Sequence, residues 1–214
     1  MQRRNLISKL CSNIYLVLVF LFLYAPILAL VIFSFNDSKS MGVLNGFTMK
    51  WYVALFRNET ILSALYYTIS IAVLASIIST IFGTITSIGI YKMRGKTKAT
   101  ILNINYLPVL NTDIVTGVAL MSLFAFFQMN FGFKTMLLSH VMFCTPYVIL
   151  SVLPKLRQLP DNVEEAALDL GATPWLAIRK IVIPQIKPGI MSGFLMAFTM
   201  SIDDFIISFF NTGN

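Results

Sequence analysis

The sequence predicts an all-α, polytopic membrane protein, and two observations predict it: the composition and the way the apolar residues are distributed. Of the 214 residues, 57% are hydrophobic and only 12% are charged, which excludes a water-soluble globular domain. The apolar residues gather in runs that reach the roughly 20 helical residues needed to cross a bilayer. We expect one domain, residues 1–214, with five spans at 14–35, 61–91, 101–127, 134–154 and 191–210.

The basic residues predict how the chain crosses the membrane. Arg3, Arg4 and Lys9 precede an apolar run that is too long for a signal peptide, so we expect an uncleaved first span with a cytoplasmic N-terminus. On this topology twelve of the sixteen lysines and arginines lie inside, in line with the positive-inside rule. The four outside are Lys39, Lys50, Arg57 and Lys134. We therefore ascribe the net charge of +7 to orientation rather than to nucleic-acid binding.

Small residues recur every four positions in the second span. Ser79, Gly83 and Ser87 fall on one helix face, where a second helix can approach closely. Small residues scattered by chance through a membrane helix explain the pattern equally well.

Residues 161–189 form a polar stretch between the last two spans and predict two short helices joined by a hinge. Asp161 can N-cap the first helix, with Glu164 at its third position, and Gly171 stands where a C′ glycine ends it. Thr173 and Pro174 then restart the chain as an N-cap followed by proline.

We expect the second of these helices to end at Pro184, because proline lacks the amide hydrogen that continues a helix. The whole stretch then forms a helix–turn–helix elbow between two membrane spans, on the cytoplasmic side.

This elbow resembles the EAA loop of ABC importer permeases, whose pattern is E-A-A-x3-G-x9-I-x-L-P. The match is carried by Glu165, Ala166, Ala167, Gly171, Ile181 and Pro184, and it departs from the pattern only in having Ile183 for leucine. The resemblance implies a type I ABC importer transmembrane domain in a bacterial inner membrane. It also implies that these six residues couple the chain to a cytoplasmic ATPase subunit. An amphipathic hairpin resting on the bilayer is the alternative.

Catalytic chemistry is not expected of this chain. The sequence has no nucleophile–base set, metal-ligand cluster or phosphate-binding loop, so ATP and Mg belong to a partner ATPase and this chain itself needs no cofactor. His140 is the only histidine. It either relays protons or binds a ligand, or it hydrogen-bonds a neighbouring helix.

Three acids lie within otherwise apolar spans: Asp113, Asp203 and Asp204. A charged aspartate near the bilayer centre costs about 2.5–3.5 kcal/mol, so each should face a water-filled path or a partner. Asp113 and Asp203 each lie twelve residues into a span, about 18 Å deep at the helical rise, so they should share one depth.

Equal depth and unmatched negative charge predict a path for a cation with one or more amines. Asp204 points about 100° away from Asp203 on a helix, so the two should not do the same job. Tyr15 and Tyr147 could add cation–π contacts to an alkylamine. Alternatively, the acids are protonated or are paired with a partner subunit.

Short motifs along the whole chain resemble the second permease subunit of spermidine/putrescine ABC importers. These motifs are Ser34-Phe35-Asn36, Gly46-Phe47-Thr48, Lys50-Trp51-Tyr52, Asp113-Ile114-Val115 and Ser201-Ile202-Asp203-Asp204. The resemblance implies that the intramembrane aspartates contribute to a polyamine path. It also implies a second permease, two ATPase subunits and an extracytoplasmic polyamine-binding protein as partners.

Permeases of this kind usually continue into a sixth span, so we expect a C-terminally truncated domain here, with the sixth helix missing. Three alternatives remain open: an ABC permease for another cationic solute, an ion-coupled secondary carrier with the aspartates as proton sites, and an inactive remnant.

Overall fold

The computed structural model describes residues 2–38, 42–160 and 163–213. Apart from one isolated bridge between Asn36 and Phe47, these residues form helices and the loops that join them. Four helices are long and apolar enough to cross a membrane, and a bent pair makes five. The expected all-α, polytopic fold is therefore confirmed. The chain divides into two compact units, Met1–Ala64 and Leu65–Asn214.

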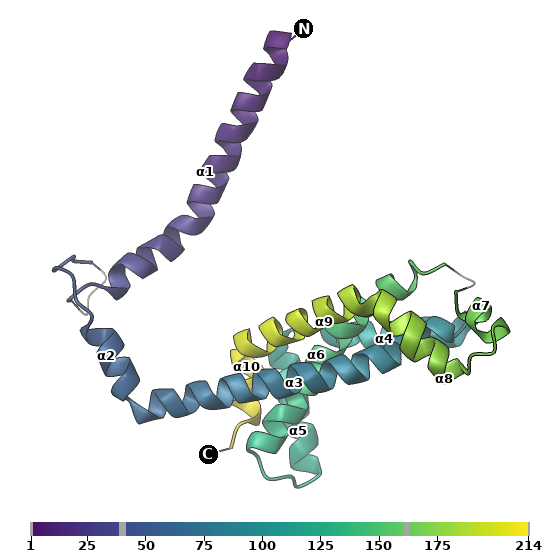
Figure 1. Ribbon diagram of the computed structural model, residues 1–214. Helices are drawn as coiled ribbons and strands as arrows, with labels where there is room; N and C mark the ends of the chain where they lie inside the picture. Colours follow the sequence, from purple (N-terminus) through teal and green to yellow (C-terminus); the bar gives the residue numbers. More distant parts are fainter. Residues whose placement is uncertain (1, 39–41, 161–162, 214) are drawn as a thin grey trace. The chain divides into compact units, whose positions relative to one another are not determined.

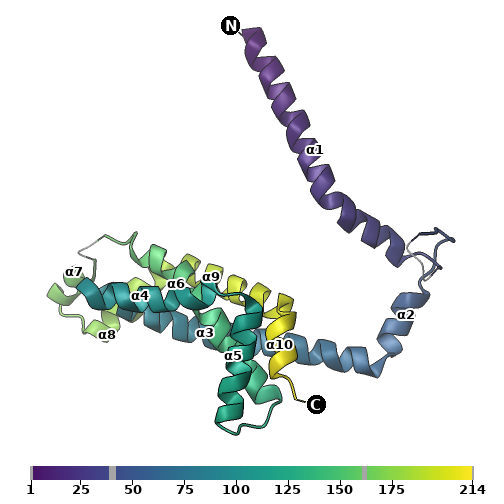
Figure 2. The ribbon, with the colours of Figure 1, turned by 180° about the vertical axis from the view of Figure 1, so that it is seen from behind.

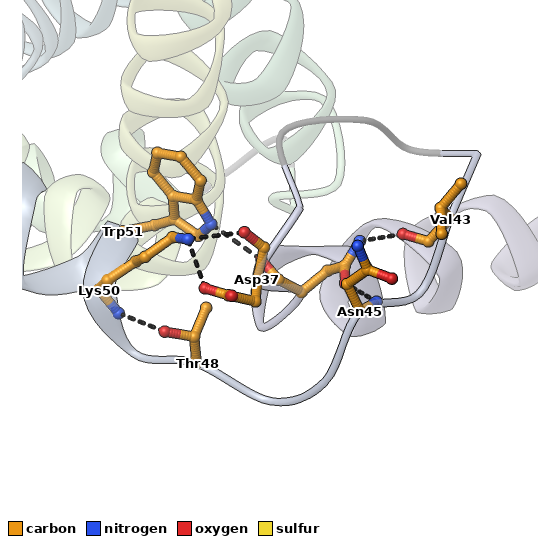
Figure 3. A network of polar contacts seen from close by, with 7 residues as sticks. Asp37, Val43, Asn45, Thr48, Lys50 and Trp51 are labelled. Carbon is orange, nitrogen blue, oxygen red and sulfur yellow. Dashed lines mark hydrogen bonds and ion pairs between the residues drawn. The ribbon is translucent and has the colours of Figure 1, made fainter.

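The first unit holds α1 (Gln2–Ser34), α2 (Lys50–Arg57) and the start of α3 (Glu59–Lys92) (Figure 1). We did not predict α2 from the sequence. A network of polar contacts connects described residues of the loop before α2, as Figure 3 shows. The Asn36 side chain donates to the carbonyl of Val43 at 2.6 Å and accepts from the amide of Asn45 at 2.8 Å.

The second unit is a helical bundle with α6 at its centre (Figures 1 and 2). Its core is built where α6 packs along α9, around Cys144, Val148, Val152, Ile186 and Ala197. Besides α3, the unit consists of α4 (Gly95–Leu110), α5 (Asp113–Phe126), α6 (Phe133–Leu156), α7 (Val163–Asp169), α8 (Pro174–Ala177), the π-helical turn η1 (Ile178–Val182), α9 (Ile183–Asp203) and α10 (Phe205–Asn211).

The small-residue face of α3 does contact another helix. The Ser79 hydroxyl donates to the carbonyl of Val141 on α6 at 3.2 Å, and Ser87 is buried. A Cβ atom on Gly83 would lie 2.7 Å from the Cβ of Val148, so α3 and α6 meet where only glycine fits. Of the two explanations for this pattern, helix packing is confirmed.

The third span, expected as one helix over 101–127, is broken. It consists of α4 and α5, bent by 107°, with Asn111 and Thr112 extended between them. Pro108 in the last turn of α4 lacks an amide hydrogen, and the polar residues after it favour capping conformations over helix. Asp113 is therefore the first residue of a new helix, and the depth that we expected for it along a continuous helix is wrong.

The fifth span, expected over 191–210, is also divided. The helix ends at Asp203, and Asp204 adopts an extended conformation before α10 begins. Asp204 suits the position at this break, because aspartate is a preferred N-cap residue.

Pro184 does not end the second elbow helix, as we had expected. It lies in the first turn of α9, and helical backbone continues from Pro174 through η1 to Asp203. Proline is tolerated there because η1 shifts the bonding: the amide of Ile183 reaches back five residues to the carbonyl of Ile178.

The contact at Gly83 can be tested against Gly89, a second glycine of α3 with no heavy atom within 4 Å of a Cβ placed on it. We expect Gly83→Ala to lower the melting temperature of the purified chain, with an overpacking cost of about 1–3 kcal/mol. Gly89→Ala should leave stability unchanged or raise it by up to about 1 kcal/mol through helix propensity. Equal melting temperatures for the two variants would contradict the packing at Gly83.

Candidate cation site at a broken helix

The break between α9 and α10 is held open by side chains. The Asp204 carboxylate accepts a hydrogen bond through Oδ1 from the amide of Ile207 at 3.0 Å, which caps α10. The hydroxyl of Ser208 donates to the Asp204 carbonyl at 2.9 Å. These bonds satisfy groups that a helix break would otherwise leave exposed to an apolar environment.

A cleft of about 210 Å³ opens at this break. The residues that line it come from α3, α6, α9, α10 and the break itself, and they are Thr68, Ile71, Met136, His140, Ser201, Ile202, Asp203, Asp204, Phe205 and Ser208. No lysine or arginine is among these described lining residues. The cleft therefore combines two carboxylates with hydroxyl groups and lacks a cation of its own.

The two oxygens of Asp204 have different surroundings. Oδ1 caps α10, whereas Oδ2 is buried and has no hydrogen-bond partner within the part of the chain that the structure describes. A buried carboxylate oxygen without a partner is costly, and an ammonium group that donates to it would remove that cost. The geometry of Asp204 thus suits a cationic ligand.

His140 ties α6 to both sides of the break. Its side chain is 1% exposed, with Nδ1 2.8 Å from the hydroxyl of Ser201 and Nε2 3.0 Å from that of Ser208. Because Ser208 already donates its proton to the Asp204 carbonyl, Nε2 must donate to Ser208 and Nδ1 must accept from Ser201. Of the two interpretations of His140, the structure supports the hydrogen bond to neighbouring helices.

Asp113 and Tyr147 lie in the same region but do not line the cleft. Asp113 is exposed at the first turn of α5. This helix packs against α10, and its Gly117 carbonyl accepts a hydrogen bond from the side-chain amide of Asn211 at 3.4 Å. Asp113 interacts electrostatically with both Asp204 and Tyr147. The structure thus groups three of the expected path residues in one neighbourhood.

The other two expected path residues are Asp203, which lies beside Asp204, and Tyr15, which lies in the other unit. Asp203 is exposed, lines the cleft as the last residue of α9 and, unlike Asp204, caps no helix. Tyr15 belongs to the unit Met1–Ala64, so its role stays a prediction. Sequence reasoning missed Thr68, Met136 and Ser208. Of these three, only Ser208 could have been recognised from the sequence, because it lies seven residues, or about two helical turns, after Ser201.

At the elbow, the expected end of α7 is confirmed. Gly171 has a φ of +84°, in the left-handed region that glycine tolerates. Its amide bonds the Leu168 carbonyl at 2.9 Å, and the next amide, of Ala172, bonds the Ala167 carbonyl at 3.0 Å. This pair of bonds is a Schellman motif, which closes the C-terminus of α7.

The start of α8 is confirmed as well. The Thr173 hydroxyl accepts from the amide of Leu176 at 3.4 Å, with Pro174 at the first helical position. Asp161 and the side chain of Glu164 lie outside the described residues, so the expected capping of α7 by Asp161 stays a prediction.

The surface of the elbow is apolar as well as charged. Glu165 and Ala166 are exposed and Ala167 is buried at 5%, while Leu170 and Trp175 are 89% and 67% exposed. Exposed large apolar side chains next to a carboxylate are typical of a surface that a protein partner covers.

Comparison with known proteins decides the family. Residues 81–213 match the family described as the inner membrane component of binding-protein-dependent transport systems. The chain belongs to this family. It is therefore a multi-pass transport permease subunit, as the EAA-like loop indicated.

Three similar proteins are named as permeases of spermidine/putrescine or putrescine transport systems. It is 36% identical over 201 residues to the spermidine/putrescine transport system permease protein PotC of Haemophilus influenzae, covering 94% of this chain and 78% of that one. It is 33% identical over 208 residues to PotC of Escherichia coli K12, with 97% and 79% covered. The putrescine transport system permease protein PotI of Escherichia coli K12 is 39% identical over 207 residues, with 92% and 73% covered.

A solved structure shares the fold. The crystal structure of a bacterial ABC transporter that imports the acidic polysaccharide alginate matches with a TM-score of 0.73 at 14% identity, covering 98% of this permease and 82% of that chain. The expected fold of an ABC importer transmembrane domain is confirmed.

The structural role of His140 can be tested. We expect His140→Ala to lower the stability of the purified permease by about 1–3 kcal/mol, because Ser201 and Ser208 lose buried hydrogen-bond partners. His140→Gln, which keeps one donor and one acceptor, should recover part of the loss in melting temperature. A His140→Ala permease with unchanged melting temperature but no transport would instead assign His140 a direct role in transport.

Proposed function

We propose that this permease is one of two membrane subunits of an ATP-driven importer of polyamines, spermidine and putrescine among them. The observation that carries the proposal is the cleft at the break between α9 and α10, where a buried carboxylate oxygen of Asp204 lacks a partner among the described residues. A primary ammonium group has three donors and a full positive charge, and it fits such an oxygen. The printed functions of the relatives point to the same class of substrate.

In this proposal the substrate passes Asp113, Asp203 and Asp204, and the rings of Tyr15 and Tyr147 add cation–π contacts along the alkyl chain. Several carboxylates suit a polyamine better than a monovalent cation, because each can take one ammonium group. His140 hydrogen-bonds the hydroxyl groups of Ser201 and Ser208, which fixes their positions beside Asp204.

We further propose that the elbow couples transport to ATP hydrolysis through Glu165, Ala166, Ala167, Gly171, Ile181 and Pro184. ATP and Mg would bind on two cytoplasmic ATPase subunits that contact this elbow. Helical backbone runs without interruption from Pro174 to Asp203, so displacement of the elbow would be carried along α9 to the cleft. This arrangement gives the ATPase a direct mechanical connection to the substrate path.

The remaining partners in this proposal are a second permease and an extracytoplasmic binding protein that delivers the polyamine. The N-terminus would be cytoplasmic, which places the elbow on the side of the ATPase. Membership in a binding-protein-dependent family favours this assembly over an ion-coupled secondary carrier.

Uptake of labelled spermidine and putrescine tests the proposal in cells that lack their own importer and receive the permease with its partner permease, ATPase and binding protein. Asp204→Asn removes the charge but keeps an oxygen that can cap α10. Loss of a hydrogen bond to a charged group costs about 1.5–3 kcal/mol, so we expect uptake at low substrate to fall about tenfold or more.

Glu59→Gln is the matched control, because Glu59 is an exposed acid at the start of α3 and should tolerate neutralisation. Uptake that survives Asp204→Asn at the wild-type level would refute the cation site. Uptake that does not depend on the ATPase would refute the importer.

A further inference from the structure

The short helix α2 is amphipathic, although no partner or site has been ascribed to it. At 100° per residue, its two basic residues, Lys50 and Arg57, fall on one side, and its largest apolar residues fall on the other. Those apolar residues are Trp51, Tyr52, Leu55 and Phe56, whereas Val53 and Ala54 flank the basic side. None of the eight residues of α2, all of which the structure describes, is buried, and Phe56 is 69% exposed.

The first end of α2 is fixed to the end of α1. The hydroxyl of Tyr52 lies 2.9 Å from that of Ser34, and the ring of Tyr52 stacks on Phe35 with 5.2 Å between centroids. Trp51 donates from Nε1 to the carbonyl of Asn36 at 2.9 Å (Figure 3). The apolar span of α1 ends at Ser34, so these bonds hold the start of α2 at the level where that span leaves the membrane.

The other end of α2 is fixed to the start of the next span. Only Asn58 separates α2 from α3, and its extended conformation (φ −88°, ψ 101°) breaks the helix there. The span of α3 begins at Glu59. Both ends of α2 therefore adjoin helices that are long and apolar enough to span a membrane, which favours a helix that runs along the membrane surface.

The charges of α2 fit that position. The ammonium group of Lys50 donates to the carbonyl of Asp37 at 2.6 Å and pairs with its carboxylate, which turns it toward the polar loop and away from the apolar face (Figure 3). Arg57 is exposed at the opposite end. A tryptophan and a tyrosine next to basic residues are typical of the interfacial zone of a bilayer, where phosphates lie above the acyl chains.

We propose that α2 is an interfacial helix that binds phospholipid. Its apolar face enters the boundary between acyl chains and headgroups, while the side that carries Lys50 and Arg57 faces the headgroup region, with Arg57 toward the phosphates. On the proposed orientation this is the outer leaflet. The lipid contact anchors the loop residues 35–38 and 42–49 at the membrane surface, and it does not depend on which solute the permease carries.

Spin labels can test this position in the full chain. Phe56→Cys and Leu55→Cys place a label on the apolar face, and Ala54→Cys places one on the side of the basic residues. Exposed Cys11 is replaced by serine, whereas Cys144 is buried and can stay. The chain is reconstituted in vesicles of phosphatidylethanolamine and phosphatidylglycerol, and the accessibility of each label to oxygen and to a water-soluble nickel chelate is measured.

Because oxygen concentrates in lipid and the chelate in water, we expect the ratio of oxygen to nickel accessibility to be severalfold higher at positions 55 and 56 than at position 54. Equal ratios with high nickel accessibility at all three positions would place α2 in water and overturn the proposal. Low accessibility to both reagents at 55 and 56 would show that protein covers this face, which overturns it as well. Agreement between the labels at 55 and 56 guards against local distortion by either substitution.

Discussion

The capping of α10 by Asp204 is the interaction on which the proposed substrate site depends. Inside a membrane every backbone polar group must find a partner in the protein, and a helix break leaves several without one. Oδ1 of Asp204, the hydroxyl of Ser208 and the His140 bridge together satisfy the break and hold it against α6. With Oδ1 engaged in this way, Oδ2 is left without a hydrogen-bond partner among the described residues, so one side chain both caps the helix and offers an unpaired acceptor beside the cleft.

A carboxylate lies at the start of two helices of the bundle, although only Asp204 caps its helix. Asp113 is the first residue of α5 and Asp204 caps α10, and these two short helices pack on each other. A carboxylate at a helix N-terminus is stabilised by the helix dipole, which offsets part of the cost of placing it in an apolar region. The breaks thus place Asp204 in the cleft and Asp113 at the start of the neighbouring helix, with no basic residue among the described residues that line the cleft. The helix dipoles hold the negative charge, and a cationic substrate can neutralise it.

The sequence was enough to predict the fold, the family, the end of α7 and the start of α8, because these depend on local signals. Apolar length set the spans, and Gly171 and Thr173 marked helix termini through their own conformational preferences. The breaks at Asn111 and Asp204 were missed because an apolar run has the same composition whether the helix inside it continues or turns. The prediction at Pro184 was wrong because the π-helical turn before this proline accommodates it, although a proline usually ends a helix. The cleft could not be foreseen, since it joins Thr68, His140 and Asp204 from parts of the chain far apart in sequence.

The central claim is that the cleft between α9 and α10 takes the amine of the substrate, and protection of a single cysteine tests it most directly. Thr68 lines the cleft and is exposed, so Thr68→Cys in a Cys11→Ser chain places a thiol there. The rate at which a small thiol reagent modifies this cysteine is measured in the assembled importer, with and without spermidine delivered by the binding protein. The account predicts that spermidine slows the modification and that Asp204→Asn abolishes this protection. A modification rate that spermidine leaves unchanged, at concentrations that saturate uptake, would contradict it.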